Sequence, residues 1–523
     1  MDPFPAAEPR AVSPAPPAAR APSLLHNVLA NYAGNLVTAV LAIALVPVYV
    51  RILGIESYGL VGVYATLQSM LALLDMGLST TLNREMAWRA ARGRGAELPS
   101  LLRTLEGFFW PLAILVGAAV ALGAPAIAGH WLRPEQVPLA TATRAVALMG
   151  GVLALEWPFA FYSGGLLGIQ RQVSLNAVVL ASAVARSAGT LLVLVYLSPT
   201  IQAFFLCQLA AAALQTGLAA VVLWRSVRVP GVTPRMDAGV LRGAGGFAAG
   251  MSGITLLAVA LTQADKVVLS RMLPLQQFGR YALAGVVATG LYRLVLPLFS
   301  ALYPRFTELV SRGDGPELAR LYHRGSQWIS VALLPAALVL ALFARQVLWL
   351  WTGDAPLADA TWRVLALLVA GTALNGLMNL PYALQLAHGW TRLTLGTNAV
   401  AVLIVVPLVI VLTRRFGPAG AAGAWALLNT GYVLVAIQLM HRRLLPGEKW
   451  RWYGVDVGLP LLAACAVALV SRMLLPEGLG RLGMLGWVAA TGTLTLGAAA
   501  LAAPETRRML IRARPAAWTE GAG

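Results

Sequence analysis

The stretch from Tyr49 to Glu85, YVRILGIESYGLVGVYATLQSMLALLDMGLSTTLNRE, aligns without a gap on Leu269 to Arg305, 220 positions further along the chain. The identical pairs are Arg51/Arg271, Leu53/Leu273, Gly59/Gly279 and four pairs of leucines. Both stretches lie among long apolar segments. An internal repeat in a membrane protein is typical of transporters, and it indicates two lobes with similar folds.

The correspondence continues downstream, in the same order and with nearly the same spacing. The tripeptide at 158–160, Pro-Phe-Ala, corresponds to Pro-Tyr-Ala at 381–383, and Asn-Ala-Val occurs at both 176–178 and 398–400. The alternative is coincidence within a sequence rich in alanine and leucine. Preserved order over more than a hundred residues favours a true repeat.

The composition is that of an integral membrane protein. Of 523 residues, 59% are hydrophobic and 11% charged, and the mean hydropathy is +0.73; soluble domains carry about 25% charged residues. The net charge of +18 therefore reflects membrane topology, and nucleic acid is not an expected partner. The two cysteines and five scattered histidines indicate neither a disulfide framework nor a metal site, and no cofactor is expected.

Apolar segments of about 20 residues predict membrane-spanning helices. Fourteen are expected, at residues 25–50, 58–81, 104–130, 139–165, 173–197, 201–224, 243–270, 280–303, 326–350, 360–386, 393–413, 419–440, 452–474 and 482–502. No connecting segment is long enough to fold by itself. This argues against an enzyme with a catalytic domain outside the membrane.

The arginines set the expected orientation, because cytoplasmic loops retain positive charge. Most of the 39 basic residues fall on one side if both termini are cytoplasmic. Six helices separate the two copies, so the repeats are parallel. The expected parts are a disordered tail at 1–23, an N-terminal lobe at 24–230, a C-terminal lobe at 231–445, two helices outside the repeat at 446–503, and a cytoplasmic tail at 504–523.

Ionisable side chains within the expected helices are the candidate site, since each costs on the order of 3 kcal/mol at mid-bilayer. They are Asp75, Glu156, Arg186, Asp265, Lys266 and Arg293. The cations Arg293, Arg186 and Lys266 are candidates for substrate binding. The acids Asp75, Glu156 and Asp265 are candidates for ion coupling or for charge pairing. The alternative is that all six merely hold helices together.

Arg186 and Arg293 each lie near the middle of a helix that contains no acid, so each needs a distant partner, water or an anionic ligand. For Arg186 the expected partner is Asp75 or Glu156. Asp265 and Lys266 are adjacent and point about 100° apart on a helix, so at least one should face another group. An anchoring role for this pair near the outer interface is the alternative.

Glu156 lies two residues before Pro158, and its counterpart two residues before Pro381 is Asn379. A proline frees a backbone carbonyl about one turn earlier, and a polar neighbour can satisfy it. Both copies therefore suit a stabilised kink. The carboxylate, present in one copy only, could also bind a coupling proton or sodium ion.

Several blocks resemble the signatures of one family, the bacterial polysaccharide and O-antigen flippases. These are the run from Tyr49 to Gly59, the run from Leu73 to Glu85, Asp265-Lys-Val-Val-Leu-Ser-Arg-Met-Leu, Gly279-Arg-Tyr, Tyr303-Pro-Arg and Trp349-Leu-Trp-Thr-Gly. The resemblance covers roughly residues 25 to 440. It places the chain in the multidrug/oligosaccharidyl-lipid/polysaccharide exporter superfamily.

The resemblance implies two six-helix lobes around a cationic cavity, alternating access, and an undecaprenyl-pyrophosphate-linked oligosaccharide as cargo. It also implies location in the cell membrane beside the polymerase and glycosyltransferase machinery of polysaccharide biosynthesis. The two extra C-terminal helices are similar to those of lipid II flippases, where they help form a lipid groove. Alternatives are a cation-coupled multidrug or metabolite exporter, or a scaffold of a polysaccharide synthase that transports nothing.

The buried charges are not repeated between the lobes. Asp75 corresponds to Val295, Arg293 to Leu73, and Asp265-Lys266 to Leu45-Val46. We therefore expect the residues shared by both copies to build the scaffold, and the charges present in only one copy to determine which cargo is bound.

Overall fold

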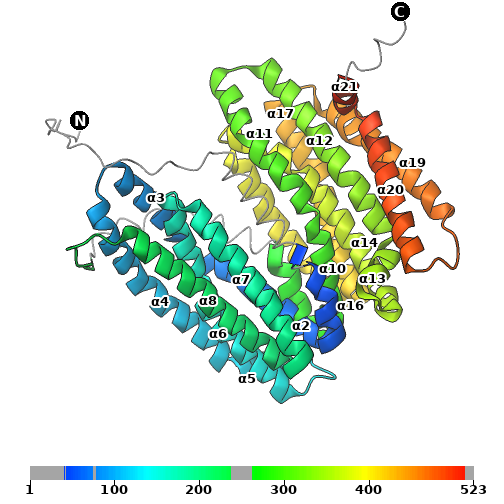
Figure 1. Cartoon of the computed structure of the whole chain (residues 1–523). Helices are drawn as coiled ribbons and strands as arrows, with labels where there is room; N and C mark the ends of the chain where they lie inside the picture. Colours follow the sequence, from blue (N-terminus) through cyan, green and yellow to red (C-terminus); the bar gives the residue numbers. More distant parts are fainter. Residues whose placement is uncertain (1–39, 42, 75–77, 237–261, 513–523) are drawn as a thin grey trace, which may run out of the picture.

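The computed structural model describes residues 40–41, 43–74, 78–236 and 262–512. These residues form helices joined by short connections, and none of them forms a strand, which confirms the predicted all-α class. Figure 1 shows two bundles side by side, an N-terminal lobe (α2 to α8) and a C-terminal lobe (α10 to α17). Helices α19 and α20 lie at the outer edge of the C-terminal lobe.

The N-terminal lobe is built around α6. Its helices are α2 (Ile55–Leu74), α3 (Leu78–Ala91), η1 (Gly95–Glu97), α4 (Leu98–Leu122), α5 (Ala124–Ala126), η2 (Ile127–Trp131), α6 (Leu139–Gly168), α7 (Gln172–Leu192), η3 (Val193–Leu197) and α8 (Ile201–Val227). α6 packs against α3, α4 and α8. Small residues allow this close approach: a Cβ atom on Gly150 would lie 2.4 Å from the carbonyl oxygen of Gly117.

The C-terminal lobe is built around α14 in the same way. This helix packs against α10, α12, α13 and α16. Its helices are α10 (Leu275–Gly290), α11 (Tyr292–Arg312), α12 (Gly315–Leu342), α13 (Ala344–Thr352), α14 (Ala355–Leu377), α15 (Asn379–Ala387), α16 (Thr391–Gly431), η4 (Tyr432–Ala436) and α17 (Ile437–Leu444). The remaining helices are α18 (Lys449–Arg451), η5 (Trp452–Gly458), α19 (Leu459–Met473), α20 (Arg481–Ala502) and α21 (Pro504–Arg512). α19 and α20 pack on α12.

A Gly-Asp pair separates two successive helices at two places in the C-terminal lobe. Gly313 and Gly353 end α11 and α13 with φ of 69° and 74°, in the left-handed region that favours glycine. The following aspartates, Asp314 and Asp354, accept hydrogen bonds from backbone N–H groups at the start of α12 and α14, at 3.1 and 2.9 Å. A proline in the first turn follows each aspartate.

Ten helical spans within the described residues are long and apolar enough to cross a membrane. One of them, at 392–444, holds two of the expected segments, because α16 changes direction at Gly417, where φ is 58°. The expected segments at 25–50 and 243–270 lie largely outside the described residues. Their last residues belong to the helical stretches 43–53 and 262–272. The transmembrane character is confirmed, and the total of fourteen stays a prediction.

The two lobes meet where α2 packs against α10. The repeat-related glycines Gly59 and Gly279 face each other there: a Cβ on Gly279 would lie 2.2 Å from the carbonyl oxygen of Ile55 and 3.3 Å from the Cα of Gly59. A Cβ on Gly59 would lie 2.5 Å from the carbonyl oxygen of Leu275. Residues that match in the sequence thus face each other across the lobe boundary, as expected near the axis of a parallel repeat.

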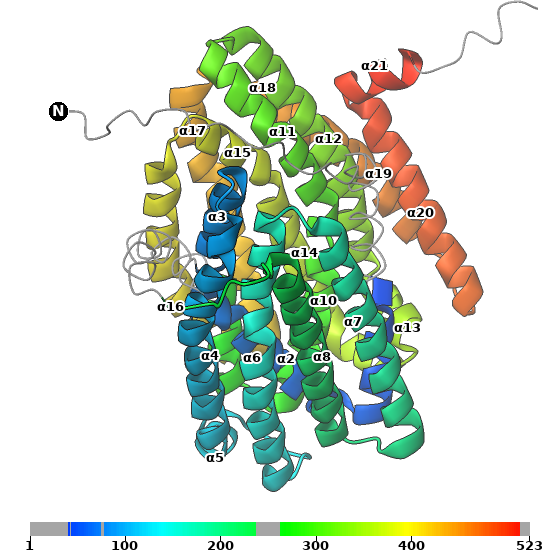
Figure 2. The same ribbon diagram turned by 60° about the vertical axis from the view of Figure 1, so that its left-hand side comes forward.

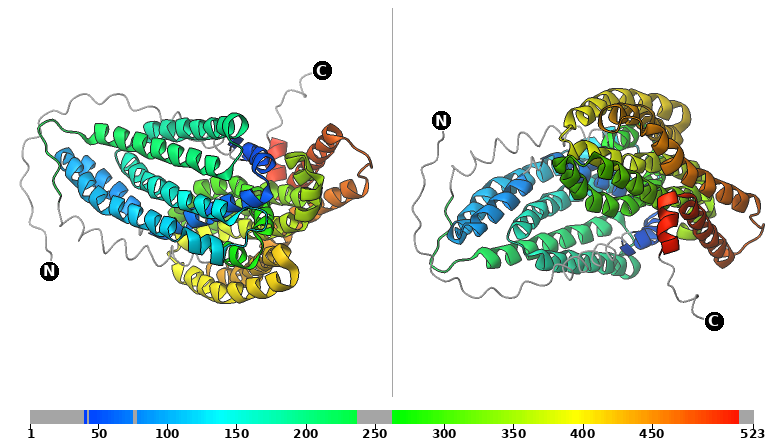
Figure 3. Two further views of the ribbon diagram at one scale, coloured as in Figure 1. Left: turned by 90° about the horizontal axis from the view of Figure 1, so that it is seen from below. Right: turned by 90° about the horizontal axis from the view of Figure 1, so that it is seen from above.

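From the α2–α10 contact the lobes diverge toward the end that carries α3, the start of α12 and α21 (Figure 1). Figure 2 shows α19, α20 and α21 along the outside of the C-terminal lobe. Figure 3, which looks along the molecule from below and from above, shows the N-terminal lobe extending to one side of the C-terminal lobe. The end with the α2–α10 contact is called the closed end below, and the opposite end is called the divergent end.

A buried polar cluster attaches the C-terminal helices to α12. The two ring nitrogens of His323 face carboxylate oxygens of Asp456, at the start of the α19 span, and Glu448, the latter at 3.0 Å. Gln327 donates to the second oxygen of Asp456 at 2.9 Å, and its own carbonyl accepts from the backbone N–H of Glu505 at 2.8 Å. His323 and Asp456 have no exposed surface. Removing either partner would leave a buried polar group unsatisfied.

We expect Asp456→Ala to lower the free energy of unfolding by about 3–5 kcal/mol, the usual cost of breaking a buried charged contact from one side. The matched control is Asp359→Ala, which removes an exposed carboxylate paired with Arg345 and should cost about 0–1 kcal/mol. Thermal unfolding of the detergent-purified variants measures both effects. Equal stability of the two variants would contradict a stabilising role for the cluster.

Candidate functional site

Four helices of the N-terminal lobe contribute to one polar group inside it. Arg186 on α7 places Nη1 3.1 Å from Oε1 of Glu156 on α6, and its Nη2 donates to Oε1 of Gln215 on α8 at 3.0 Å. Tyr64 on α2 donates its hydroxyl to the other oxygen of Glu156. The side chains of Arg186 and Glu156 are 23% and 15% exposed. Of the two acids expected to pair with Arg186, the structure places Glu156 there.

This group is a neutral ion pair that is partly exposed. A guanidinium carries five N–H donors, and the contacts to Glu156 and Gln215 leave Arg186 with spare donors and a partly exposed surface. An anion approaching Arg186 would compete with Glu156 for it. The other candidate partner, Asp75, lies outside the described residues.

Glu156 and its repeat counterpart Asn379 have different roles in the structure. Asn379 donates to the carbonyls of Asn375 and Gly376, each at 3.2 Å, where α14 ends before Pro381. This is the role predicted from the proline. Glu156 faces Tyr64 and Arg186 instead, while α6 continues past Pro158. The carboxylate therefore belongs to the charged group and not to the kink.

Arg293 lies in the first turn of α11 and is exposed. Within the part of the chain that the structure describes, it forms no ion pair. Its neighbour Tyr292 points into the lobe and donates to Oδ1 of Asn375 at 2.9 Å, and Asn375 donates to Asn429 at 2.8 Å. Because adjacent residues lie about 100° apart on a helix, Arg293 is on a different face, where its charge is not neutralised by a described carboxylate.

Lys266 and Asp265 lie in the helical segment 262–272, which leads into α10. Lys266 donates to the carbonyl of Thr262 at 3.0 Å, and Asp265 accepts the hydroxyl of the buried Tyr281. Each side chain therefore has a partner other than its neighbour, as expected from their spacing. The two charged groups also approach each other to 3.6 Å. Lys266 is consequently a weaker candidate for an anion than Arg293.

Two buried polar groups were missed in the sequence. Glu106 on α4 is 7% exposed and accepts from Tyr162 at 2.7 Å and Trp224 at 2.8 Å. Glu106 lies two residues from the start of the expected helix at 104–130, where a charged residue gives no signal of burial. The His323–Asp456 cluster was missed for the same reason. In both cases the sequence signal of a buried acid was present: Glu106 and Asp456 are each followed by a long apolar stretch in the same segment.

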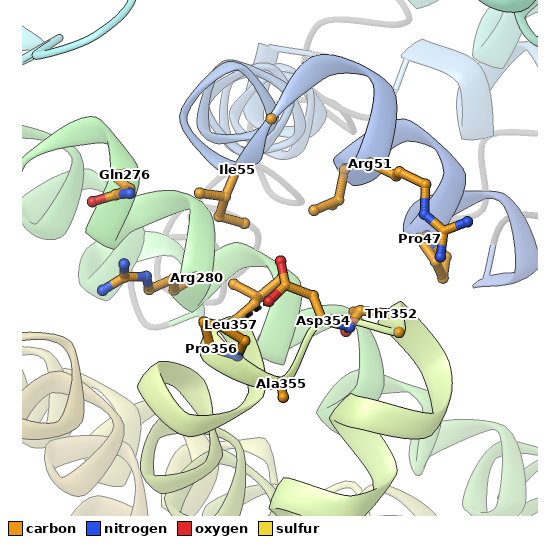
Figure 4. A pocket seen from close by; sticks show the side chains of 13 residues that line it. Pro47, Arg51, Ile55, Gln276, Arg280, Thr352, Asp354, Ala355, Pro356 and Leu357 are labelled. Carbon is orange, nitrogen blue, oxygen red and sulfur yellow. Dashed lines mark hydrogen bonds between the residues drawn. The ribbon is translucent and has the colours of Figure 1, made fainter. Parts of the chain in front are cut away.

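A cavity of about 650 Å³ opens at the closed end, between the lobes (Figure 4). Its polar lining includes Arg51, Arg280, Gln276 and Asp354. Arg51 and Arg280 lie on opposite sides of the cavity, with Asp354 between them. None of these residues is among the six charges expected inside the helices, and Arg51 and Asp354 lie at helix ends.

The structure thus shows a membrane protein of many spanning helices arranged in two lobes, with charged groups inside them. Residues 24–310, more than half of the chain, match the family described as polysaccharide biosynthesis protein, and the chain belongs to that family. It is 20% identical over 415 residues to a Shigella flexneri protein named as an O-antigen transporter, covering 77% of this chain and 94% of that protein.

Solved transporter structures share the fold. A structure described as the lipid II flippase MurJ in an inward closed conformation superposes with a TM-score of 0.68 at 12% identity, over 93% of this chain and all of that one. An inward-facing multidrug transporter of the MATE family has a TM-score of 0.63 at 13% identity, over 79% of this chain and 94% of that one. These likenesses confirm the fold predicted from the repeat and the resemblance.

Proposed function

We propose that this protein moves a lipid-linked oligosaccharide, with an undecaprenyl-pyrophosphate anchor, from the cytoplasmic to the outer leaflet of the cell membrane. The observation that carries the proposal is Arg293, an exposed cation within the membrane region that has no carboxylate partner among the described residues. Family membership and the O-antigen transporter relative support polysaccharide as the cargo.

The physical problem is to carry an anionic headgroup through hydrocarbon while its lipid tail stays outside. A pyrophosphate needs cationic donors in a sheltered, hydrated space, and guanidinium groups bind phosphate with two parallel hydrogen bonds. In this proposal Arg293 attracts the headgroup from the C-terminal lobe. Arg186 of the N-terminal lobe binds it when the phosphate displaces Glu156.

The lobes act by alternating access in this proposal. The divergent end, which carries α3, the start of α12 and α21, faces the cytoplasm in this proposal, which agrees with the arginine-rich connections at that end. Separation of α2 from α10 would open the closed end to the outside. The proposed process contains no covalent step, and the cargo passes to the polymerase and glycosyltransferase machinery at the outer surface.

We expect Arg293→Ala to lower surface polysaccharide by about tenfold to a hundredfold in a deletion strain complemented with the variant, because one charge-assisted hydrogen bond contributes about 1.5–3 kcal/mol. Arg305→Ala is the matched control. It removes an exposed arginine of the same helix that is already paired with Glu308, and export should stay within about twofold. Membrane levels of both variants are measured by immunoblot.

Two outcomes would contradict the proposal. Unchanged surface polysaccharide in the deletion strain, with no lipid-linked sugar accumulating on the cytoplasmic side, would exclude the flippase function. Sensitivity of that strain to cationic drugs, with normal polysaccharide, would favour the alternative of a cation-coupled exporter.

A further inference from the structure

Two arginines from distant parts of the chain converge on Gly353 at the closed end. A Cβ atom on Gly353 would lie 2.9 Å from Nη2 of Arg51, at the end of the helical segment 43–53, and 3.5 Å from Nη1 of Arg481, the first residue of α20. The two nitrogens are therefore no farther apart than 6.4 Å, which is 2.9 plus 3.5. Like charges at this distance repel each other unless an anion lies between them.

Neither guanidinium has a counterion in the part of the chain that the structure describes. Both side chains are exposed, and Arg481 donates one hydrogen bond to the carbonyl of Leu350 at 2.7 Å. Asp354 borders the same cavity, but its carboxylate caps the first turn of α14 by accepting from Leu357. Local positive charge therefore exceeds negative charge. By contrast, Arg345 near the same end is paired with Asp359.

The cavity beside Arg51 adds a third cation. Arg280 lies across it, and the Nε of Arg280 is buried without a hydrogen-bond partner. The volume of about 650 Å³ falls within the range of about 300–1,000 Å³ of small-molecule sites. A cavity of this size accommodates a phosphate group together with part of its organic substituent.

Gly353 is the residue that makes this arrangement possible. Its φ of 74° ends α13, and the absence of a side chain leaves room for the guanidinium of Arg51. Arg51 and Gly353 also belong to two of the sequence blocks that resemble the flippase signatures, and the proposed role of the charges inside the lobes does not involve either residue. The structure brings both blocks together with α20.

We propose that Arg51 and Arg481, with Arg280 across the cavity, form a binding site for a phosphate group at the closed end. The chemistry fits a phosphodiester in a lipid headgroup as well as a free pyrophosphate, because both present oxygen pairs to the planar guanidinium fork. Neither Arg186 nor Arg293 lines this cavity, and the site does not depend on the identity of the transported cargo.

The test uses the full-length protein in detergent. Native mass spectrometry measures the dissociation constant of phosphatidylglycerol, and titration calorimetry measures that of inorganic pyrophosphate, for the wild type, Arg51→Gln and Arg481→Gln. We expect each variant to raise the dissociation constant of at least one of the two anions by about tenfold. The control Arg345→Gln, which removes a paired arginine near the same end, should bind both as the wild type does.

Each outcome decides the proposal. Weaker phosphatidylglycerol binding identifies a lipid headgroup as the ligand, and weaker pyrophosphate binding alone identifies a soluble anion. Wild-type affinity for both probes in Arg51→Gln and Arg481→Gln would overturn the site. If Arg51→Gln is unstable, Arg481→Gln decides the question. Arg481→Lys, which retains the positive charge, is then compared with it.

Discussion

A disulfide introduced between α2 and α10 by Gly62→Cys and Ala282→Cys should abolish export, and a reductant should restore it. A Cβ on Gly62 would lie 2.7 Å from the Cβ of Ala282, so a small outward movement brings the pair to the Cβ separation of about 3.8 Å found in disulfides. If the closed end must open in each cycle, covalent closure leaves no route across the membrane.

The double variant is made in a background in which Cys207 and Cys465, both free, are replaced by serine. The single variants Gly62→Cys and Ala282→Cys are the controls, because they carry the same steric change without the cross-link. Mass spectrometry of the intact protein reports the disulfide. Full export by the cross-linked protein would contradict an opening between α2 and α10.

Arg186→Ala should lower export by about tenfold to a hundredfold while the protein still inserts in the membrane, on the same charge-assisted hydrogen-bond estimate as for Arg293. The double variant Arg186→Ala with Glu156→Ala separates two explanations. If Arg186 served only to neutralise Glu156, removing both charges would restore export. If Arg186 binds the cargo, the double variant stays as defective as Arg186→Ala.

Glu156→Gln adds a second readout to this comparison. It keeps the shape of the side chain and the hydrogen-bonding capacity toward Tyr64, but it releases Arg186 from its counterion. We expect this variant to bind the anionic headgroup more tightly and to release it more slowly, so that export falls while cargo bound to the purified protein increases. Loss of bound cargo would argue against Arg186 as a cargo ligand.

The repeat predicted the architecture well because the glycines that match between its two copies have a steric role. Gly59 and Gly279 match in the sequence and face each other in the structure, where any side chain would clash with the opposite helix. The helix bounds were also close, since length and hydropathy determine which segments span the membrane. Segment 139–165 was expected and α6 covers Leu139–Gly168.

The partners of the charged side chains were harder to predict. Arg186 needed an acid, but hydropathy does not identify which distant residue supplies it, and only the packing of α6 against α7 brings Glu156 within reach. The convergence of Arg51 and Arg481 on Gly353 depends on three separate elements. Such contacts depend on how the ends of different helices meet. The hydrophobic pattern within one helix carries no information about that.

Transfer of a lipid-linked oligosaccharide between leaflets can be followed with the purified protein. The most direct measurement follows a fluorescent, pyrophosphate-linked oligosaccharide lipid in vesicles that contain the purified protein, with a membrane-impermeant quencher added outside. We expect the protein to make the inner-leaflet lipid accessible to the quencher, and the cross-linked Gly62→Cys/Ala282→Cys variant to do so only after reduction. Quenching no greater than in protein-free vesicles would contradict the proposed transfer between leaflets.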